Sequence, residues 1–166
     1  MTVAIVGASE TTELGRIPDL SQLQLHADAA LNTMADAKIK PSDIDGVATA
    51  GASPTEIAHY LGIAPRWADG TSVGGCSFML HVRHAVAAIE AGHCTTVLIT
   101  HGESGRSGVG RGGFFGGGGG ASLAGQFEMP YGPNGPTTMF TVGVLRYMKE
   151  FGLTHEQLAS VAVVQR

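Results

Sequence analysis

Charged residues, cysteines and long apolar runs are all scarce in this sequence of 166 residues, and each shortage excludes some functions. Only 14% of the residues are charged, the ten Lys and Arg never form a run, and the net charge is −4. This balance argues against nucleic acid as a partner. No window reaches about 18 uninterrupted apolar residues, so we expect no membrane span.

The two cysteines, Cys76 and Cys94, do not belong to CxxC pairs. Without such pairs a structural zinc site is not expected, and the sequence suggests no bound metal. Reduced thiols in a cytoplasmic protein are the default expectation. Residues 1–6 lack the basic start and the long apolar stretch of a secretory signal, which agrees with that setting.

Glycine is abundant, and much of it lies in one segment. Of 25 glycines, 11 fall between Gly105 and Gly125. Because glycine adds no side-chain packing and loses much backbone entropy on ordering, this window is predicted to form neither ordinary helix nor strand. It also lacks the Gly-Lys-Ser/Thr ending of a phosphate-binding loop. A flexible surface loop is the simplest interpretation.

Strand and helix patterns alternate along the chain, which predicts an α/β fold with at least some parallel strands. Strands are predicted at 2–6, 46–50, 67–73 and 95–100, and helices at 21–37, 54–61, 76–91, 137–151 and 154–165. The last helix begins with Thr154-His-Glu-Gln157, a capping-box pattern. Its helical pattern still runs at Arg166 without a stop signal, so we expect a partial chain.

A nucleophile candidate lies in Val73-Gly-Gly-Cys-Ser77, between a predicted strand and a predicted helix. Gly74 and Gly75 allow the chain to turn sharply into the helix and leave room for a substrate carbonyl. Cys76 would then lie in the first helical turn, where free N–H groups and the helix dipole favour the thiolate. The alternative is a buried, inert cysteine, which is the commoner fate. We expect Cys94, after the end of that helix, to be structural.

Two histidines, His81 and His84, lie three residues apart on the same predicted helix. A metal site would need further ligands at compatible positions, so packing or hydrogen bonding is the favoured interpretation. His101 and Glu103 follow a predicted strand end, where α/β folds often place functional groups.

The stretch from Gly74 to Ser104 resembles the nucleophile helix and following strand of thiolases. The closest similarity is to the sterol-carrier-protein-type thiolases and thiolase-like proteins, and further similar segments lie at 2–7, 11–15, 40–46 and 126–132. This resemblance implies the N-terminal half of a thiolase fold, a layered αβαβα architecture. Residues 1–166 would form one N-terminal thiolase-like domain, with 105–151 as a loop region over the active site and the C-terminal half absent.

The resemblance also implies a reaction, an acyl-CoA thiolase (acetyl-CoA acyltransferase) reaction, as expected in lipid degradation. Cys76 would accept the acyl group as a thioester in a ping-pong transfer. Gly74 and Gly75, with Met139 and Phe140, would contact the substrate. Coenzyme A would act as the thioester substrate, with no permanently bound cofactor. The activating histidine and second cysteine of the family lie in the absent half, so this chain alone should be inactive.

The chain departs from the family pattern at Phe78 and Met79, where many thiolases have small residues after the Cys-Ser pair. Two alternatives to the thiolase reaction stay open. Some thiolase-like proteins cleave a β-hydroxyacyl-CoA side chain by a retro-aldol reaction, typically without the nucleophilic cysteine. Others could be non-catalytic subunits that bind acyl-CoA or lipid. In the family interpretation His101 and Glu103 support the floor of the active site and are not catalytic.

The resemblance implies partners as well. Thiolases generally form homodimers through the N-terminal half, and thiolase-like members can pair with small OB-fold, zinc-containing accessory proteins. Arg106 and Arg111, in the glycine-rich window, could meet coenzyme A phosphates, although solvated loop arginines are common.

Overall fold

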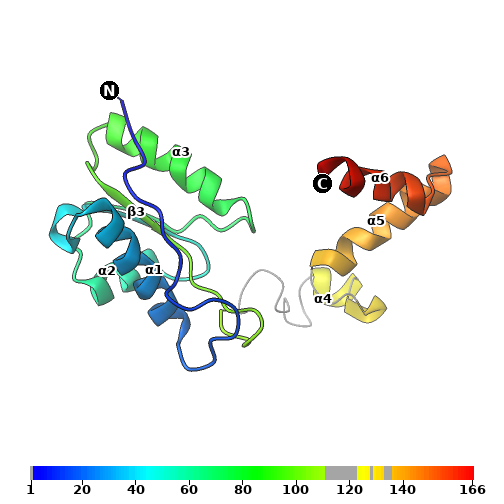
Figure 1. Cartoon of the computed structure of the whole chain (residues 1–166), viewed down its shortest axis with the longest axis horizontal. Helices are drawn as coiled ribbons and strands as arrows, with labels where there is room; N and C mark the ends of the chain where they lie inside the picture. Colours follow the sequence, from blue (N-terminus) through cyan, green and yellow to red (C-terminus); the bar gives the residue numbers. More distant parts are fainter. Residues whose placement is uncertain (1, 111–122, 128, 133–135) are drawn as a thin grey trace. The chain divides into compact units, whose positions relative to one another are not determined.

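The structure, a computed structural model, describes residues 2–110, 123–127, 129–132 and 136–166. The chain divides into two compact units, Met1–Phe114 and Phe115–Arg166, and each is described here by itself (Figure 1). The first unit contains a sheet and its helices, and the second contains helices.

The first unit is built on three parallel strands in the order β2-β1-β3, with β1 at Gly46–Thr49, β2 at Trp67–Asp69 and β3 at Val97–Thr100. All four residues of β1 are buried, as expected for a central strand covered on both faces. Gly46 faces close neighbours, since a Cβ there would lie 2.8 Å from Val97 Cγ2. Because the strands are parallel, their carboxyl ends meet at one edge of the sheet.

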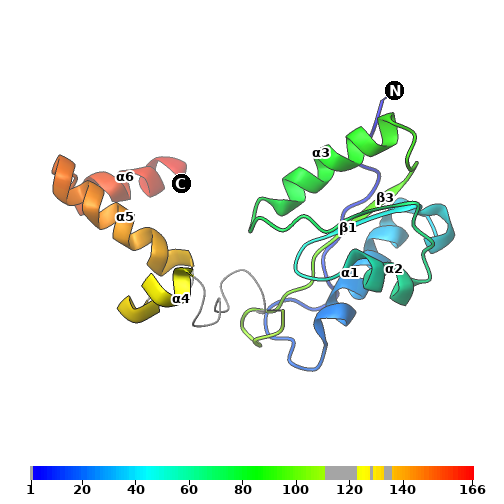
Figure 2. The ribbon, with the colours of Figure 1, turned by 180° about the vertical axis from the view of Figure 1, so that it is seen from behind.

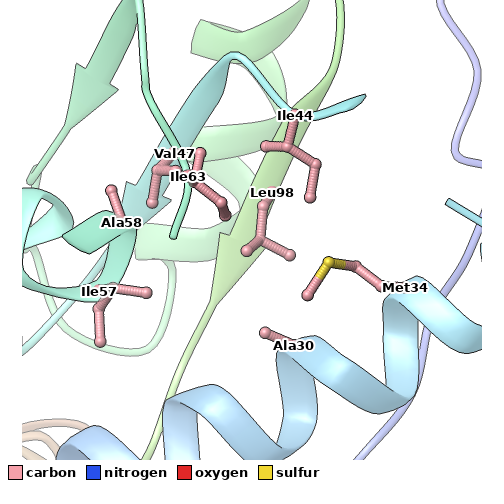
Figure 3. Close-up of a cluster of buried hydrophobic side chains, with 8 residues drawn as sticks. All are labelled: Ala30, Met34, Ile44, Val47, Ile57, Ala58, Ile63 and Leu98. Atoms are coloured by element: carbon pink, nitrogen blue, oxygen red, sulfur yellow. The ribbon is translucent and has the colours of Figure 1, made fainter. Parts of the chain in front are cut away.

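Helices cover both faces of this sheet. α1 (Gln22–Ala37) and α2 (Pro54–Leu61) lie on one face, and α3 (Ser77–Glu90) lies on the other (Figures 1 and 2). The core under α1 and α2 consists of buried aliphatic and methionine side chains (Figure 3), namely Ala30, Met34, Ile44, Val47, Ile57, Ala58, Ile63 and Leu98. The expected α/β class with parallel strands is confirmed.

Local signals set the helix ends. Ser21 caps α1 in a capping box with Gln24, and Gly62 ends α2 in the left-handed conformation at φ 69°. α3 ends at Glu90, and Gly92 follows at φ 76°. The predicted helices at 21–37, 54–61 and 76–91 are therefore confirmed to within a residue or so. A short 3₁₀ turn at Pro41–Asp43 leads into β1.

Two strand predictions need correction. Residues 2–6 form no strand, and Ile5 and Val6 are 79% and 65% exposed. A β-branched run needs a partner strand to form a sheet, and the contact with α1 begins just after this segment, where the Ala8 N–H donates to Asp36. The strand predicted at 67–73 stops at Asp69, because the Asp69 carboxylate accepts hydrogen bonds from the backbone and hydroxyl of Thr71 and turns the chain.

The second unit contains α4 (Leu123–Phe127), a 3₁₀ turn at Met129–Tyr131, α5 (Pro136–Phe151) and α6 (His155–Gln165). Thr154 caps α6 in the predicted capping box with Gln157. The glycine-rich window was predicted to lack helix, which is wrong at its end, since Gly125 lies in α4. Most of that window, 111–122, lies outside the described residues.

Some apolar side chains of the second unit are exposed. Phe140 is 72% exposed and Leu145 is 54% exposed, so they are not core residues of this unit. Across the part of the chain that the structure describes, no helix combines the length and apolar character that crossing a bilayer requires.

Candidate active site

Four rings from three different elements form a row at the carboxyl edge of the sheet. His26 of α1 and His101, which follows β3, have ring centroids 6.1 Å apart. The ring of Phe78, at the start of α3, is 4.9 Å from that of His101 and 6.0 Å from that of His81. We call His26, His101, Phe78 and His81 the aromatic row. In open α/β sheets, the strand carboxyl ends are where ligands commonly bind.

The amino end of α3 lies beside this row and carries the predicted nucleophile. Cys76 is the N-cap of α3 and is exposed, and Gly74 before it has φ 85°, a conformation that favours glycine. A Cβ on Gly75 would meet no atom of the described part of the chain within 4 Å. The predicted glycine hinge is thus present. The Cys76 Sγ lies 3.6 Å from the Val73 carbonyl oxygen. Because a carbonyl oxygen only accepts, the S–H group of Cys76 is the donor in this contact.

The other cysteine has the opposite environment. Cys94 is 1% exposed, and burial, helped by the Asp45 carboxylate, raises the pKa of its thiol. A buried thiol with a raised pKa is an inert packing group. This agrees with its predicted structural role.

His26 is fully buried and neutral. Its Nδ1 lies 2.9 Å from the Thr100 hydroxyl, while no described residue makes a hydrogen bond with its Nε2. Burial, reinforced by the nearby charge of His101, lowers the pKa of His26 to about 4. Gly102 makes this packing possible, because a Cβ there would lie 2.5 Å from His26 Cδ2.

His101 is the accessible member of the row. Its side chain is 40% exposed, and its Nε2 lies 3.2 Å from Glu103 Oε2. Its Nδ1 lies 3.4 Å from the Ala50 carbonyl oxygen, at the end of β1. An imidazole paired with a carboxylate and open to solvent is the usual composition of a proton-transfer group. The resemblance implies only a supporting role for His101 and Glu103, and no pattern in the sequence singles out His26.

His84 and Asp69 form a second polar pair at the edge strand. His84 Nδ1 lies 2.7 Å from Asp69 Oδ2. Burial raises the pKa of Asp69, but hydrogen bonds from Thr71 and His84 outweigh this effect and the pKa is lowered. The pair lies in an open groove of about 570 Å³, lined by Trp67, Ala68, Asp69, Thr71, His84, Ala87, Ala88, Ala91 and His93. The favoured interpretation of His84, hydrogen bonding, is confirmed.

The predicted site residues are distributed over both units. Gly74, Gly75 and Cys76 lie together at the start of α3 in the first unit. Met139 and Phe140 lie in α5 of the second unit, and the Met139 side chain is outside the described residues. Their substrate contacts stay predictions. Arg106 is exposed, and Arg111 lies outside the described residues.

The chain is similar to proteins that are named as aldolases and a lyase. The chain is 33% identical, over 99% of its length, to a steroid side-chain-cleaving aldolase from Thermomonospora curvata. It is 29% identical, over 98% of its length, to a 17-hydroxy-3-oxo-4-pregnene-20-carboxyl-CoA lyase from Mycobacterium tuberculosis. A solved Ltp2-ChsH2(DUF35) aldolase aligns with 91% of the chain at a TM-score of 0.73 and 31% identity. No family model matches the chain.

The alignments cover only part of each relative. The chain spans 43% and 44% of the two curated proteins and 39% of the solved chain. The sheet with its covering helices and the TM-score together confirm the expected fold class, a thiolase-like α/β fold.

The expected acyltransferase activity is wrong. The two curated relatives and the solved chain described above are named as aldolases and a lyase. Similar folds host different reactions, so the resemblance to thiolases indicated the architecture correctly but not the chemistry.

Proposed function

We propose that this chain is part of a lyase that cleaves the side chain of a steroid-like 3-hydroxyacyl-CoA by a retro-aldol reaction. The observation that carries this proposal is the 33% identity to a steroid side-chain-cleaving aldolase, which extends over 99% of the chain. The coenzyme A thioester in the name of the second relative supports the substrate class.

The reaction needs two proton transfers and no covalent enzyme intermediate. A base removes the proton of the 3-hydroxyl group. The bond between the hydroxyl-bearing carbon and the neighbouring carbon breaks, so that a ketone forms and the electron pair enters the enolate of the thioester. The enolate carbon then takes a proton, which yields a shortened acyl-CoA. No acyl group moves to the protein, so Cys76 needs no nucleophilic role.

His101 with Glu103 is the pair in the described residues that best fits the proton transfer. It is exposed at the carboxyl edge of the sheet. The two ring nitrogens face the Glu103 carboxylate and the Ala50 carbonyl oxygen, so the ring is placed to donate a proton and the Glu103 carboxylate to accept one. The neutral His26 behind it adds no competing charge. General acid–base catalysis by a positioned histidine contributes on the order of 10²- to 10⁴-fold to a rate.

A protein partner is part of the proposal. The name of the solved aldolase joins Ltp2 to ChsH2(DUF35), which supports a partner chain for this protein too. A zinc-containing OB-fold accessory protein and a homodimer are the proposed forms of this assembly. A cytoplasmic location is also proposed, because the sequence suggests reduced thiols and these are typical of cytoplasmic proteins.

The test uses the full-length protein with its partner and 17-hydroxy-3-oxo-4-pregnene-20-carboxyl-CoA as the probe substrate. Products are identified by liquid chromatography and mass spectrometry. We expect the ring ketone and a shortened acyl-CoA in equal amounts. Cleavage of a 3-ketoacyl-CoA in place of the 3-hydroxyacyl-CoA would contradict the proposal. Binding of the probe without any cleavage would contradict it as well, in favour of a non-catalytic subunit.

A further inference from the structure

The segment Thr71–Cys76, which we call the hinge segment, is held by side chains that point back from α3. Ser77 makes the short-range ties: its hydroxyl donates to the Gly74 carbonyl oxygen at 2.6 Å and accepts from the Val73 N–H at 2.9 Å. His81 reaches further, since its Nε2 lies 2.9 Å from the Thr71 carbonyl oxygen, ten residues earlier.

Thr71 is therefore fixed at each of its polar groups. Its N–H and its hydroxyl both donate to Asp69 Oδ1, at 2.9 Å and 2.6 Å, and its carbonyl group accepts from His81. Asp69 holds the segment from the end of β2, and His81 holds it from α3. These hydrogen bonds therefore connect β2, which precedes the hinge segment, to α3, which follows it.

The imidazole of His81 is not explained by packing alone. The side chain is fully buried, and because a carbonyl oxygen only accepts, Nε2 must carry the hydrogen. In the neutral ring Nδ1 is then an acceptor, and it is buried without a hydrogen-bond partner among the residues that the structure describes. Leaving a buried polar atom unpaired is costly, so a purely apolar ring would pack there with less penalty. What the imidazole adds is the bond to Thr71.

We propose that His81 is a positioning residue that fixes the hinge segment, and with it the glycines and Cys76 at the edge of the candidate active site. Phe78 lies one turn before His81, and its ring contacts the rings of both His81 and His101. The position of His101 is therefore also linked to His81. The consequence for catalysis rests on the proposed lyase function, whereas the structural tie does not depend on it.

The two cysteines allow a direct measurement of this tie. Cys76 is exposed in the hinge segment, and Cys94, which precedes β3, is 1% exposed. Alkylation by iodoacetamide, followed peptide by peptide with mass spectrometry, reports the hinge segment through Cys76 and global opening through Cys94. The variants are His81→Phe, which keeps a ring but loses the donor, and His81→Gln, whose amide nitrogen reaches a position similar to that of Nε2.

We expect H81F to change the alkylation rate of Cys76 severalfold while Cys94 stays protected, and H81Q to label like the wild type. A wild-type rate at Cys76 in H81F would overturn the proposal. Rapid labelling of Cys94 would reveal that H81F unfolds. In that case the alkylation rate of Cys76 is compared between H81Q and His81→Asn. The shorter Asn cannot reach the Thr71 carbonyl group, so only H81N should alter Cys76 labelling, and equal labelling in the two would overturn the proposal.

The same variants separate this inference from the proposed function. In the full-length protein, H81F should lower kcat/KM for side-chain cleavage by roughly 10- to 100-fold, as a displaced site element does. H81Q should restore it. An inactive wild type would contradict the lyase function while leaving the alkylation result to decide the role of His81. An active wild type with equal kcat/KM in H81F and H81Q would contradict the role of His81 alone.

Discussion

The ring of Phe78 lies 4.9 Å, centroid to centroid, from the ring of His101. Many thiolases have small residues at this point of the helix, and the bulk of Phe78 is a departure from that pattern. The structure shows what the bulk does: it connects the amino end of α3 with the residue that follows β3. Phe78 thus forms part of the wall behind the candidate proton-transfer group.

Replacing Phe78 should loosen that wall. We expect Phe78→Ala to destabilise the protein by about 1–3 kcal/mol, below the full cost of a core aromatic because the ring is only half-buried. Urea unfolding measures the stability, and Phe78→Leu, which keeps apolar volume, is the control. Equal stability of the Ala variant and the wild type would show that the ring contact with His101 carries no weight.

Replacing His101 should remove the proposed proton-transfer group. We expect His101→Gln to lower kcat for side-chain cleavage by roughly 10²- to 10⁴-fold with little change in urea stability. His93→Gln is the matched control, because His93 is an exposed histidine of the same unit outside the aromatic row. If H101Q retains the kcat of the wild type, the acid–base group lies elsewhere in the protein.

Gly102 should tolerate no side chain. A Cβ there would lie 2.5 Å from His26 Cδ2 and 2.7 Å from the Gln22 carbonyl oxygen, and the latter is backbone that cannot rotate away. We expect Gly102→Ala to cost about 1–3 kcal/mol of unfolding free energy, as overpacked sites do. Gly105→Ala is the control, since its nearest neighbour would be Glu103 Oε1 at 3.8 Å. A G102A variant as stable as G105A would contradict the close approach of β3 to α1.

The stability of the first unit should depend on pH through His26. The pKa of His26 is about 4 in the folded state, against 6.5 for an unperturbed histidine. Between these values the unfolded chain binds a proton that the folded chain does not, so the unfolding free energy falls as the pH falls. Above about pH 6.5 the ring is neutral in both states and contributes no slope.

The measurement compares urea unfolding at pH 7 and pH 5 for the wild type and His26→Asn. From pH 7 to pH 5, the unfolding free energy of the wild type should fall by about 2 kcal/mol more than that of the variant. This follows from about 1.4 kcal/mol per unit of difference between the folded and unfolded pKa values. Equal losses in both proteins would mean that the ring of His26 takes up a proton in the folded state.

The sequence predicts well what neighbouring residues determine. The bounds of α2 follow from Pro54 at its first position and Gly62 at its end. The turn into α3 follows from Gly74 and Gly75. The strand predicted at 2–6 failed because a strand requires a partner, and no local pattern reveals whether a partner is present.

The candidate site was harder to predict for the same reason. His26 and His101 are 75 positions apart in the chain and meet only because α1 packs beside the end of β3. No spacing in the sequence connects them. The sequence left the reaction class open between acyl transfer and retro-aldol cleavage, and the names of the relatives favour the second. The segments that resemble thiolases determine the fold, whereas the chemistry depends on individual side chains placed on it.

The central claim, lyase chemistry in place of acyl transfer, is tested most directly by the effect of free coenzyme A on cleavage. The full-length protein and its partner are incubated with the steroid 3-hydroxyacyl-CoA, with and without added coenzyme A, and the cleavage rate is measured. The mass of the peptide that contains Cys76 is determined by mass spectrometry during turnover. The account predicts the same rate in both conditions and an unmodified Cys76 peptide. A rate that requires free coenzyme A, together with an acyl mass on Cys76, would contradict it.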